Sequence, residues 1–247
     1  MQLSSIIKKV VMALTGWLLI GFLVAHLMGN FLLLQGSERY DAYSAFLEHN
    51  PLLLPAEVAL VLIFVVHVYL AVQLSWENMK ARPTEYALRQ TGGQSVWASR
   101  NMLITGLITV IFVVVHIWQF KYGTRPEHSL WQLVVSSFQN PTVVVFYLLC
   151  LALIGLHLSH GIGSTFQSLG LRSHSGRPRL LGASPALAFL LAAGFASLPL
   201  WVFLTSKRSD VQTFSSPKID QVVPASVPKP RPQSTSNQSS TSSLPGE

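Results

Sequence analysis

The chain has 247 residues, of which 50% are hydrophobic and 11% are charged. Soluble domains carry about 25% charged residues, so this composition excludes an ordinary soluble domain and indicates a membrane protein. The net charge of +7 does not indicate a nucleic-acid partner, because lysine and arginine form short clusters between apolar runs and no basic face. The single cysteine, Cys150, excludes a disulfide framework and a CxxC motif, and we expect it to be a small core residue.

Five apolar runs predict five membrane-spanning helices, because each is long enough to cross about 30 Å of hydrocarbon. The runs cover residues 10–34, 52–76, 102–120, 141–165 and 181–204. We expect the first run to remain as a helix, since it is longer than the apolar core of a signal peptide and lacks a convincing cleavage site. The predicted fold class is an all-α integral membrane protein with five transmembrane helices.

Two domains are predicted: a membrane domain over residues 1–208 and a tail over residues 209–247. The tail is rich in Ser and Pro and buries too little apolar surface to order, so we expect it to be disordered. Two segments that mix aromatic and polar residues at helical spacing, 37–50 and 128–139, are expected to lie along the membrane surface as connectors.

Basic residues between the runs predict the orientation of the chain. On one side lie Lys8, Lys9, Lys80, Arg82, Arg89, Arg100, Arg172, Arg177 and Arg179, and in the opposing loops lie Arg39, Lys121 and Arg125. The excess of positive charge places the N-terminus in the cytoplasm and the C-terminus outside. Lys207 and Arg208, after the last run, argue mildly the other way.

Four of the eight histidines lie in apolar surroundings: His26, His67, His116 and His157. An ionisable side chain at that depth is costly and usually has a partner. Any one of them alone is equally well explained as a core histidine bonded to a neighbouring helix. The four together are not explained so easily, because each lies 16 or 17 residues after the point where its helix enters the membrane. At 1.5 Å per residue, successive antiparallel helices then place their histidines at two levels about 13 Å apart.

The two levels pair the histidines: His26 with His116 at the outer level and His67 with His157 at the inner level. A repeat supports this pairing, since TGWLLIGFLVAH at 15–26 and TGLITVIFVVVH at 105–116 share T-G-x9-H, and each partner histidine follows 41 residues later. Two histidines at one level of a helical bundle can hold a haem iron from both faces. We therefore predict that the first four helices form a bundle with two bis-histidine haems that carry out electron transfer.

Small and polar residues fit this interpretation. Glycines that give a macrocycle room are Gly16, Gly21, Gly29, Gly106, Gly155, Gly161 and Gly163, although ordinary helix packing explains glycine equally well. Candidate partners for haem propionates are Gln119, Lys121 and Tyr122 outside, and Ser159, His160 and Ser164 inside. His160 suits a propionate contact; the alternative is that it is itself the axial ligand.

These residues resemble the di-haem, five-helix cytochrome b subunit of succinate dehydrogenase and fumarate reductase complexes. The resemblance covers residues 8 to about 205 and is carried by HLMGN, AEVALVLIFVVH, VVVHIWQFKYG and HLSHGIGSTFQSLG. The last motif contains H-x-x-x-G, from His157 to Gly161. The resemblance implies that His67 and His157 bind the haem nearer the cytoplasmic partners, and that His26 and His116 bind the outer one.

The resemblance also implies partners and a location. A flavoprotein subunit would oxidise succinate, an iron–sulfur subunit would pass the electrons on, and this chain would anchor both without dicarboxylate chemistry of its own. Its haems would reduce a quinone, menaquinone in most di-haem relatives, in the bacterial cytoplasmic membrane. Candidates for an acidic residue at the quinone site are Glu38, Asp41, Glu48 and Glu57.

Three other functions compete with this one. A di-haem cytochrome b of a hydrogenase or formate dehydrogenase also uses intramembrane histidines, but at a different helix spacing. A transporter that relays protons through histidine would carry carboxylates or broken helices near the midplane, and the spans hold almost none. A structural anchor without a cofactor would leave four equally deep histidines unexplained.

Overall fold

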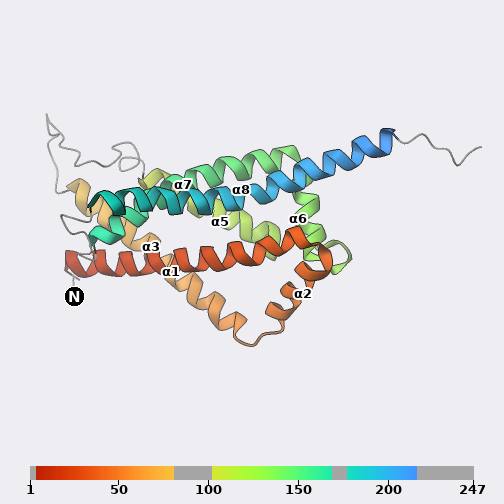
Figure 1. Ribbon diagram of the computed structural model, residues 1–247. Coiled ribbons are helices and arrows are strands. Elements are labelled where there is room, and N and C mark those ends of the chain that lie inside the picture. Colours follow the sequence, from red (N-terminus) through yellow and green to blue (C-terminus); the bar gives the residue numbers. More distant parts are fainter. Residues whose placement is uncertain (1–3, 81–101, 169–176, 216–247) are drawn as a thin grey trace, which may run out of the picture. The chain divides into compact units, whose positions relative to one another are not determined.

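The computed structural model describes residues 4–80, 102–168 and 177–215, and every regular element in these ranges is a helix (Figure 1). The chain divides into two units, Met1–Ser209 and Asp210–Glu247. The last helix continues to Ser215, beyond the predicted domain boundary at residue 209. The rest of the predicted tail lies outside the described residues, so its disorder stays a prediction.

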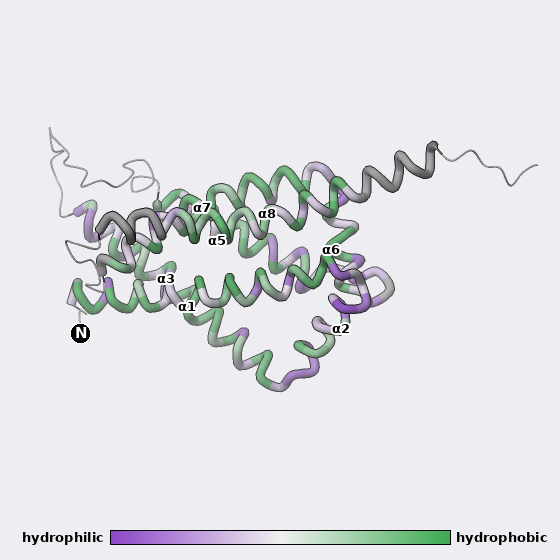
Figure 2. Tube along the Cα trace, viewed as in Figure 1, coloured by the Kyte–Doolittle hydropathy of each residue, from purple (hydrophilic) through white to green (hydrophobic). Residues whose placement is uncertain are grey.

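Five long helices follow one another through the first unit. They are α1 (Ser5–Asn30), which continues as the 3-10 helix η1 (Phe31–Gln35), α3 (Leu53–Lys80), α5 (Met102–Lys121), α7 (Pro141–Ser168) and α8 (Arg177–Ser215). Each contains a stretch long and apolar enough to cross a membrane, and Figure 2 shows their mostly hydrophobic course. The predicted all-α fold with five spans is confirmed; the direction in which the chain crosses stays a prediction.

Helix is the conformation that hydrocarbon demands of these runs, because it satisfies every backbone N–H and C=O within the segment. Large apolar side chains remain exposed along the spans, among them Leu62 on α3, Leu107 on α5 and Phe189 on α8. Such a surface suits lipid tails as solvent, which do not penalise exposed leucine or phenylalanine. The helices therefore pack through selected faces only, and Cys150 is one of the buried residues, as predicted.

Four of the helices form a bundle in which α1 packs against α3 and α7, while α5 packs mainly against α7. Because α1 and α5 make no major contact, and neither do α3 and α7, these two pairs face each other across the bundle diagonals. Lys8 at the start of α1 forms an ion pair with Glu77 at the end of α3, so these two helices run antiparallel. Helix α8 packs against both α7 and α1: Ala192 lies beside Gly155 of α7, and Leu27 of α1 packs against the backbone of Gly194.

The two short helices α2 (Ser37–Glu48) and α6 (Leu130–Gln139) pack together at one end of the bundle, and we call them the α2/α6 cap (Figure 1). These are the two segments expected to be helical connectors. Gly36, at φ 97°, makes the turn into α2; this left-handed conformation favours glycine. Placement along a membrane surface stays a prediction.

Asp41 is the centre of the α2/α6 cap. Its two carboxylate oxygens accept hydrogen bonds from the Ser129 hydroxyl at 2.6 Å and from the Trp131 backbone N–H at 2.9 Å, so Asp41 satisfies the first turn of α6. The Trp131 indole donates to the Leu33 carbonyl at 3.2 Å. Arg125, on the connection to α6, bonds to Glu48 at 2.6 Å, and this hydrogen bond holds the pKa of Glu48 below its usual value.

Replacing Asp41 with alanine should loosen the α2/α6 cap. Two hydrogen bonds to a carboxylate are lost, and we expect the protein to be destabilised by about 2 kcal/mol. Thermal unfolding of the purified protein in detergent and hydrogen–deuterium exchange over residues 130–139 measure the effect. Glu38→Ala is the matched control, because Glu38 is exposed on the same helix and bonds to no residue that the structure describes. Unchanged exchange in Asp41→Ala would contradict the assignment of Asp41 as the anchor of α6.

Candidate functional site

Two of the four partly buried histidines, His67 on α3 and His157 on α7, lie at the end of the bundle away from the cap, and we call them the far-side pair. The Nδ1 atom of His67 lies 3.1 Å from the Thr15 hydroxyl on α1. In the same way, Nδ1 of His157 lies 3.4 Å from the Thr105 hydroxyl on α5. Each threonine precedes its histidine by 52 residues, so the internal repeat seen in the sequence is also a repeat of side-chain contacts.

The hydrogen bonds around the far-side pair favour a proton on Nδ1 of each ring. The Thr15 hydroxyl donates to the Met12 carbonyl at 2.9 Å, and the Thr105 hydroxyl donates to the Met102 carbonyl at 3.1 Å. Each hydroxyl oxygen is then left to accept from an Nδ1–H of histidine. This network assigns the proton to Nδ1 and leaves the lone pair on Nε2, the nitrogen available to a metal.

A glycine lies beside each imidazole of the far-side pair. A Cβ at Gly16 would lie 3.5 Å from Cε1 of His67, and a Cβ at Gly106 would lie 3.2 Å from Cε1 of His157. The imidazoles therefore lie against the backbone of the neighbouring helix, beside the threonine that holds them. Each T-G dipeptide of the repeat therefore contacts a histidine from the neighbouring helix.

The remaining two histidines, His26 on α1 and His116 on α5, lie toward the cap, and we call them the cap-side pair. Their ring centroids are 5.9 Å apart and their planes are nearly perpendicular, at 89°. Two metal–nitrogen bonds of about 2 Å, together with the ring radii, separate imidazole centroids across one metal ion by about 6 Å. The observed separation fits a shared haem iron.

Aromatic rings surround the cap-side pair and keep its surroundings apolar. Phe22 stacks on His26 at 5.3 Å, and Phe112 stacks on His116 at 5.7 Å between ring centroids. Phe195 of α8 lies 5.8 Å from His26. The fifth helix therefore contributes to this level of the bundle, although its sequence contains no buried histidine in the span.

Polar partners of the cap-side pair differ from the threonines of the far-side pair. The Asn30 amide donates to the backbone carbonyl of His26 at 2.8 Å and lies 3.3 Å from Nε2 of the same residue. The Tyr40 hydroxyl of α2 donates to the Asn30 side-chain oxygen at 3.2 Å. Burial, followed by the neighbouring Asp41 carboxylate, raises the pKa of Tyr40 to about 12, so its hydroxyl remains a donor at neutral pH. His116 instead faces the Tyr147 hydroxyl.

The other predicted site residues occupy varied positions. An added Cβ at Gly161 would meet no atom within 4 Å, so this glycine borders open space. His160 is partly buried and interacts electrostatically with His157. The Ser164 hydroxyl donates to the Gly161 carbonyl at 3.0 Å. Among the candidates outside, Gln119 accepts from Tyr147 at 2.9 Å.

Three of the four acidic candidates for a quinone site have partners within the protein. Glu57 forms an ion pair with Lys121, which joins the start of α3 to the end of α5. Glu48 pairs with Arg125, and Asp41 caps α6. In the described ranges, no group of three or more His, Cys, Asp or Glu side chains could hold a bare metal ion; an axial pair of histidines is a different kind of site.

The anchoring residues Thr15, Thr105, Tyr147 and Asn30 were not identified as site residues from the sequence. The T-G repeat contained the signal for the two threonines, since both copies place threonine at the same distance from the buried histidine of their own helix. Asn30 lies one turn after His26, a spacing that brings side chains together on a helix. Nothing in the sequence connected Tyr147 with His116.

No family model matches this sequence, and no solved structure matches it. The chain is similar to the succinate dehydrogenase cytochrome b558 subunit of Bacillus subtilis (strain 168), with 22% identity over 152 residues, which cover 61% of this chain and 72% of the relative. This likeness confirms the resemblance drawn from the sequence motifs. With the five membrane-length helices, it supports a membrane cytochrome b of the succinate dehydrogenase family.

Alanine at the two repeated glycines should have opposite effects on stability. In a helix, Gly→Ala stabilises by about 0.5–1 kcal/mol when space allows, and Gly16→Ala gives only an ordinary contact with His67. Gly106→Ala crowds the His157 ring, which Thr105 holds in place, and should destabilise by about 1 kcal/mol. Thermal unfolding followed by circular dichroism compares the two variants. Equal unfolding temperatures would contradict the close seating of His157.

Proposed function

We propose that this chain, a relative of a succinate dehydrogenase cytochrome b subunit, anchors such a complex in the membrane and relays its electrons through two b haems to a quinone. His67 with His157 would hold one haem, and His26 with His116 the other. The observation that supports the proposal is that four partly buried imidazoles lie in one membrane bundle, with the rings of His26 and His116 side by side and with hydroxyl groups near Nδ1 of three of the four.

The residues around the histidines support ligation rather than a purely structural role. A histidine that binds a metal usually gives its second ring N–H to a hydrogen-bond acceptor, which orients the ring and makes the ligating nitrogen more basic. Thr15 and Thr105 are suited to this task at the far-side pair.

A haem with two imidazole ligands has no free coordination position, so the chemistry it supplies is one-electron transfer. The chain's own residues would hold the ligands at fixed positions and exclude water with the phenylalanines that line the cap-side pair. Gly161 borders open space beside His157 and would leave room for a macrocycle. His160 and Ser164 are the proposed contacts for propionates at the far-side level, and Lys121 and Tyr122 at the cap-side level.

A flavoprotein and an iron–sulfur subunit are the proposed partners, because the relative is a subunit of succinate dehydrogenase by name. Dicarboxylate oxidation would take place on the flavoprotein, and this chain would carry no such chemistry. Menaquinone is the first quinone to test. The proposed location is the bacterial cytoplasmic membrane with the N-terminus inside, which puts the far-side pair nearer the soluble partners.

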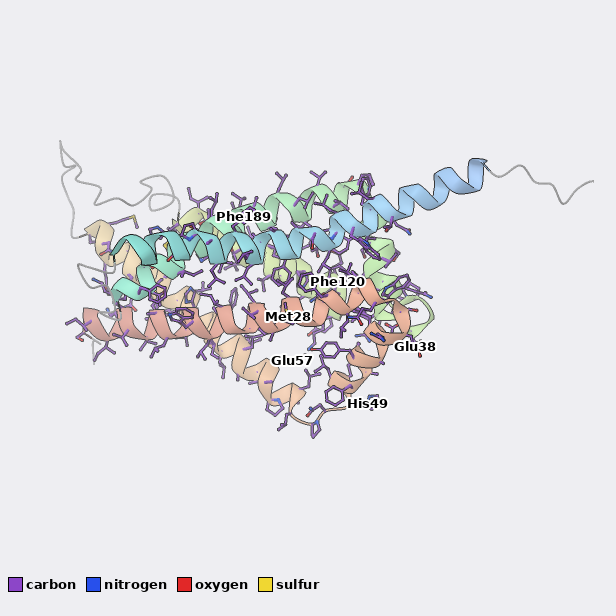
Figure 3. All side chains as sticks on the ribbon, viewed as in Figure 1. Met28, Glu38, His49, Glu57, Phe120 and Phe189 are labelled. Atoms are coloured by element: carbon purple, nitrogen blue, oxygen red, sulfur yellow. The ribbon has the colours of Figure 1, made fainter. Side chains whose placement is uncertain are left out.

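Removing one histidine should remove one haem. We expect the purified wild-type protein to show a reduced-minus-oxidised b-type spectrum with two haems per chain. His67→Ala or His157→Ala should lose the far-side haem, and His26→Ala or His116→Ala the cap-side haem, each leaving about half of the absorbance. His49→Ala is the control, since His49 is exposed at the turn after α2 (Figure 3). A colourless wild-type protein would refute the proposal.

The partner distinguishes this proposal from other di-haem cytochromes. Affinity purification of the tagged full-length chain from mild detergent should recover a flavin-containing subunit and an iron–sulfur subunit in stoichiometric amounts, together with succinate-dependent reduction of its haems. A hydrogenase or formate dehydrogenase cytochrome would instead recover a nickel- or molybdenum-containing subunit. That second outcome would retain the haems and overturn the assignment to succinate dehydrogenase.

A further inference from the structure

Tyr147 of α7 is one of the most buried residues of the bundle, with 4% of its surface exposed. Its ring lies among Phe138 at 5.0 Å, Phe112 at 5.2 Å and Phe120 at 6.0 Å between centroids. Phe120, in the last turn of α5, is labelled in Figure 3. A phenol hydroxyl in such an aromatic setting is costly unless it is hydrogen-bonded, so the partners of this hydroxyl reveal why tyrosine is present.

The Tyr147 hydroxyl has two partners, both on α5. It donates to the Gln119 side-chain oxygen at 2.9 Å, and its own oxygen lies 3.4 Å from Nδ1 of His116. Because its proton is directed to Gln119, the phenol oxygen presents a lone pair to His116. Gln119 lies almost one turn beyond His116 on the same helix, so one helix supplies both the histidine and the group that orients its partner.

The contact between Tyr147 and His116 has no counterpart in the other copy of the internal repeat. At the far-side pair, both histidines are held by threonines at equivalent positions of the two copies. Tyr147 lies ten residues before His157, and the residue ten before His67 is Glu57, which forms an ion pair with Lys121. The two levels thus differ: matched hydroxyls hold the far-side pair, while a phenol on one side and an asparagine on the other contact the cap-side pair.

We infer that Tyr147, oriented by Gln119, is a positioning residue for His116 and tunes the cap-side haem independently of the far-side haem. The inference rests on the proposed function, because it concerns haems held by these histidines. An acceptor at Nδ1 makes the ligating nitrogen more basic and favours the oxidised iron, so its loss raises the reduction potential and weakens the haem's attachment. Thr105 has the same role for His157 at the other level.

The test compares two isosteric substitutions in the full-length protein within its complex. Tyr147→Phe removes only the cap-side hydroxyl, and Thr105→Val removes only a far-side hydroxyl. Redox titration of the difference spectrum and electron paramagnetic resonance of the oxidised haems are the measurements, with each haem assigned from the His116→Ala and His157→Ala variants. We expect Tyr147→Phe to raise the cap-side potential alone, and to weaken haem binding there by about 10-fold or more. Thr105→Val should raise the far-side potential alone.

Tyr43→Phe is the matched control, because Tyr43 packs at the same end of the bundle, against Gly29; it should change neither potential. Gln119→Leu should reproduce part of the Tyr147→Phe shift, since the phenol proton then loses its acceptor. Selective loss of the cap-side haem in Tyr147→Phe would also support the inference. Two haems with unchanged potentials, or an equal shift of both, would overturn it while leaving the proposed function intact; absence of haem from the wild type would instead refute the proposed function.

Discussion

The constraint on which this structure depends is that lipid hydrocarbon offers no hydrogen bonds. Backbone groups meet the constraint by forming helices, but a side chain such as histidine has to find its partner on a neighbouring helix. In this protein the partners of two histidines are Thr15 and Thr105, and each of these hydroxyls donates its proton to a carbonyl of its own helix. The hydroxyl oxygen then accepts a hydrogen bond from Nδ1–H of the imidazole. The packing of two helices therefore favours the tautomer with its proton on Nδ1.

The same constraint explains why threonine and glycine occur together in the repeat. Glycine brings the imidazole against the backbone of the partner helix, and the adjacent threonine supplies the acceptor that the approach requires. Since the same contact recurs between α1 and α3 and between α5 and α7, the bundle consists of two similar helical hairpins, and α8 packs against α7 and α1.

At the cap end the repeat is lost, and the side chains that differ are those that connect the histidines to the short helices. Asn30 links His26 to Tyr40 on α2, while Asp41, the next residue, caps α6. On the other side, Tyr147 contacts His116 and donates its own proton to Gln119. When the environments of two redox centres differ, their reduction potentials differ, and this difference gives electron transfer between them a direction. The loss of the repeat at the cap end therefore suits the proposed relay.

From the sequence alone, the number of spans and the levels of the histidines could be derived, because hydropathy is local and the rise per residue of a helix is constant. The pairing of His26 with His116 followed from that constant rise, and the structure places these rings together. What only the tertiary structure decided is the rotation of each helix about its axis and hence which side chains meet. The contact of Tyr147 with His116 and the capping of α6 by Asp41 join residues far apart in the chain, and no local pattern encodes such meetings, since they depend on how neighbouring helices pack.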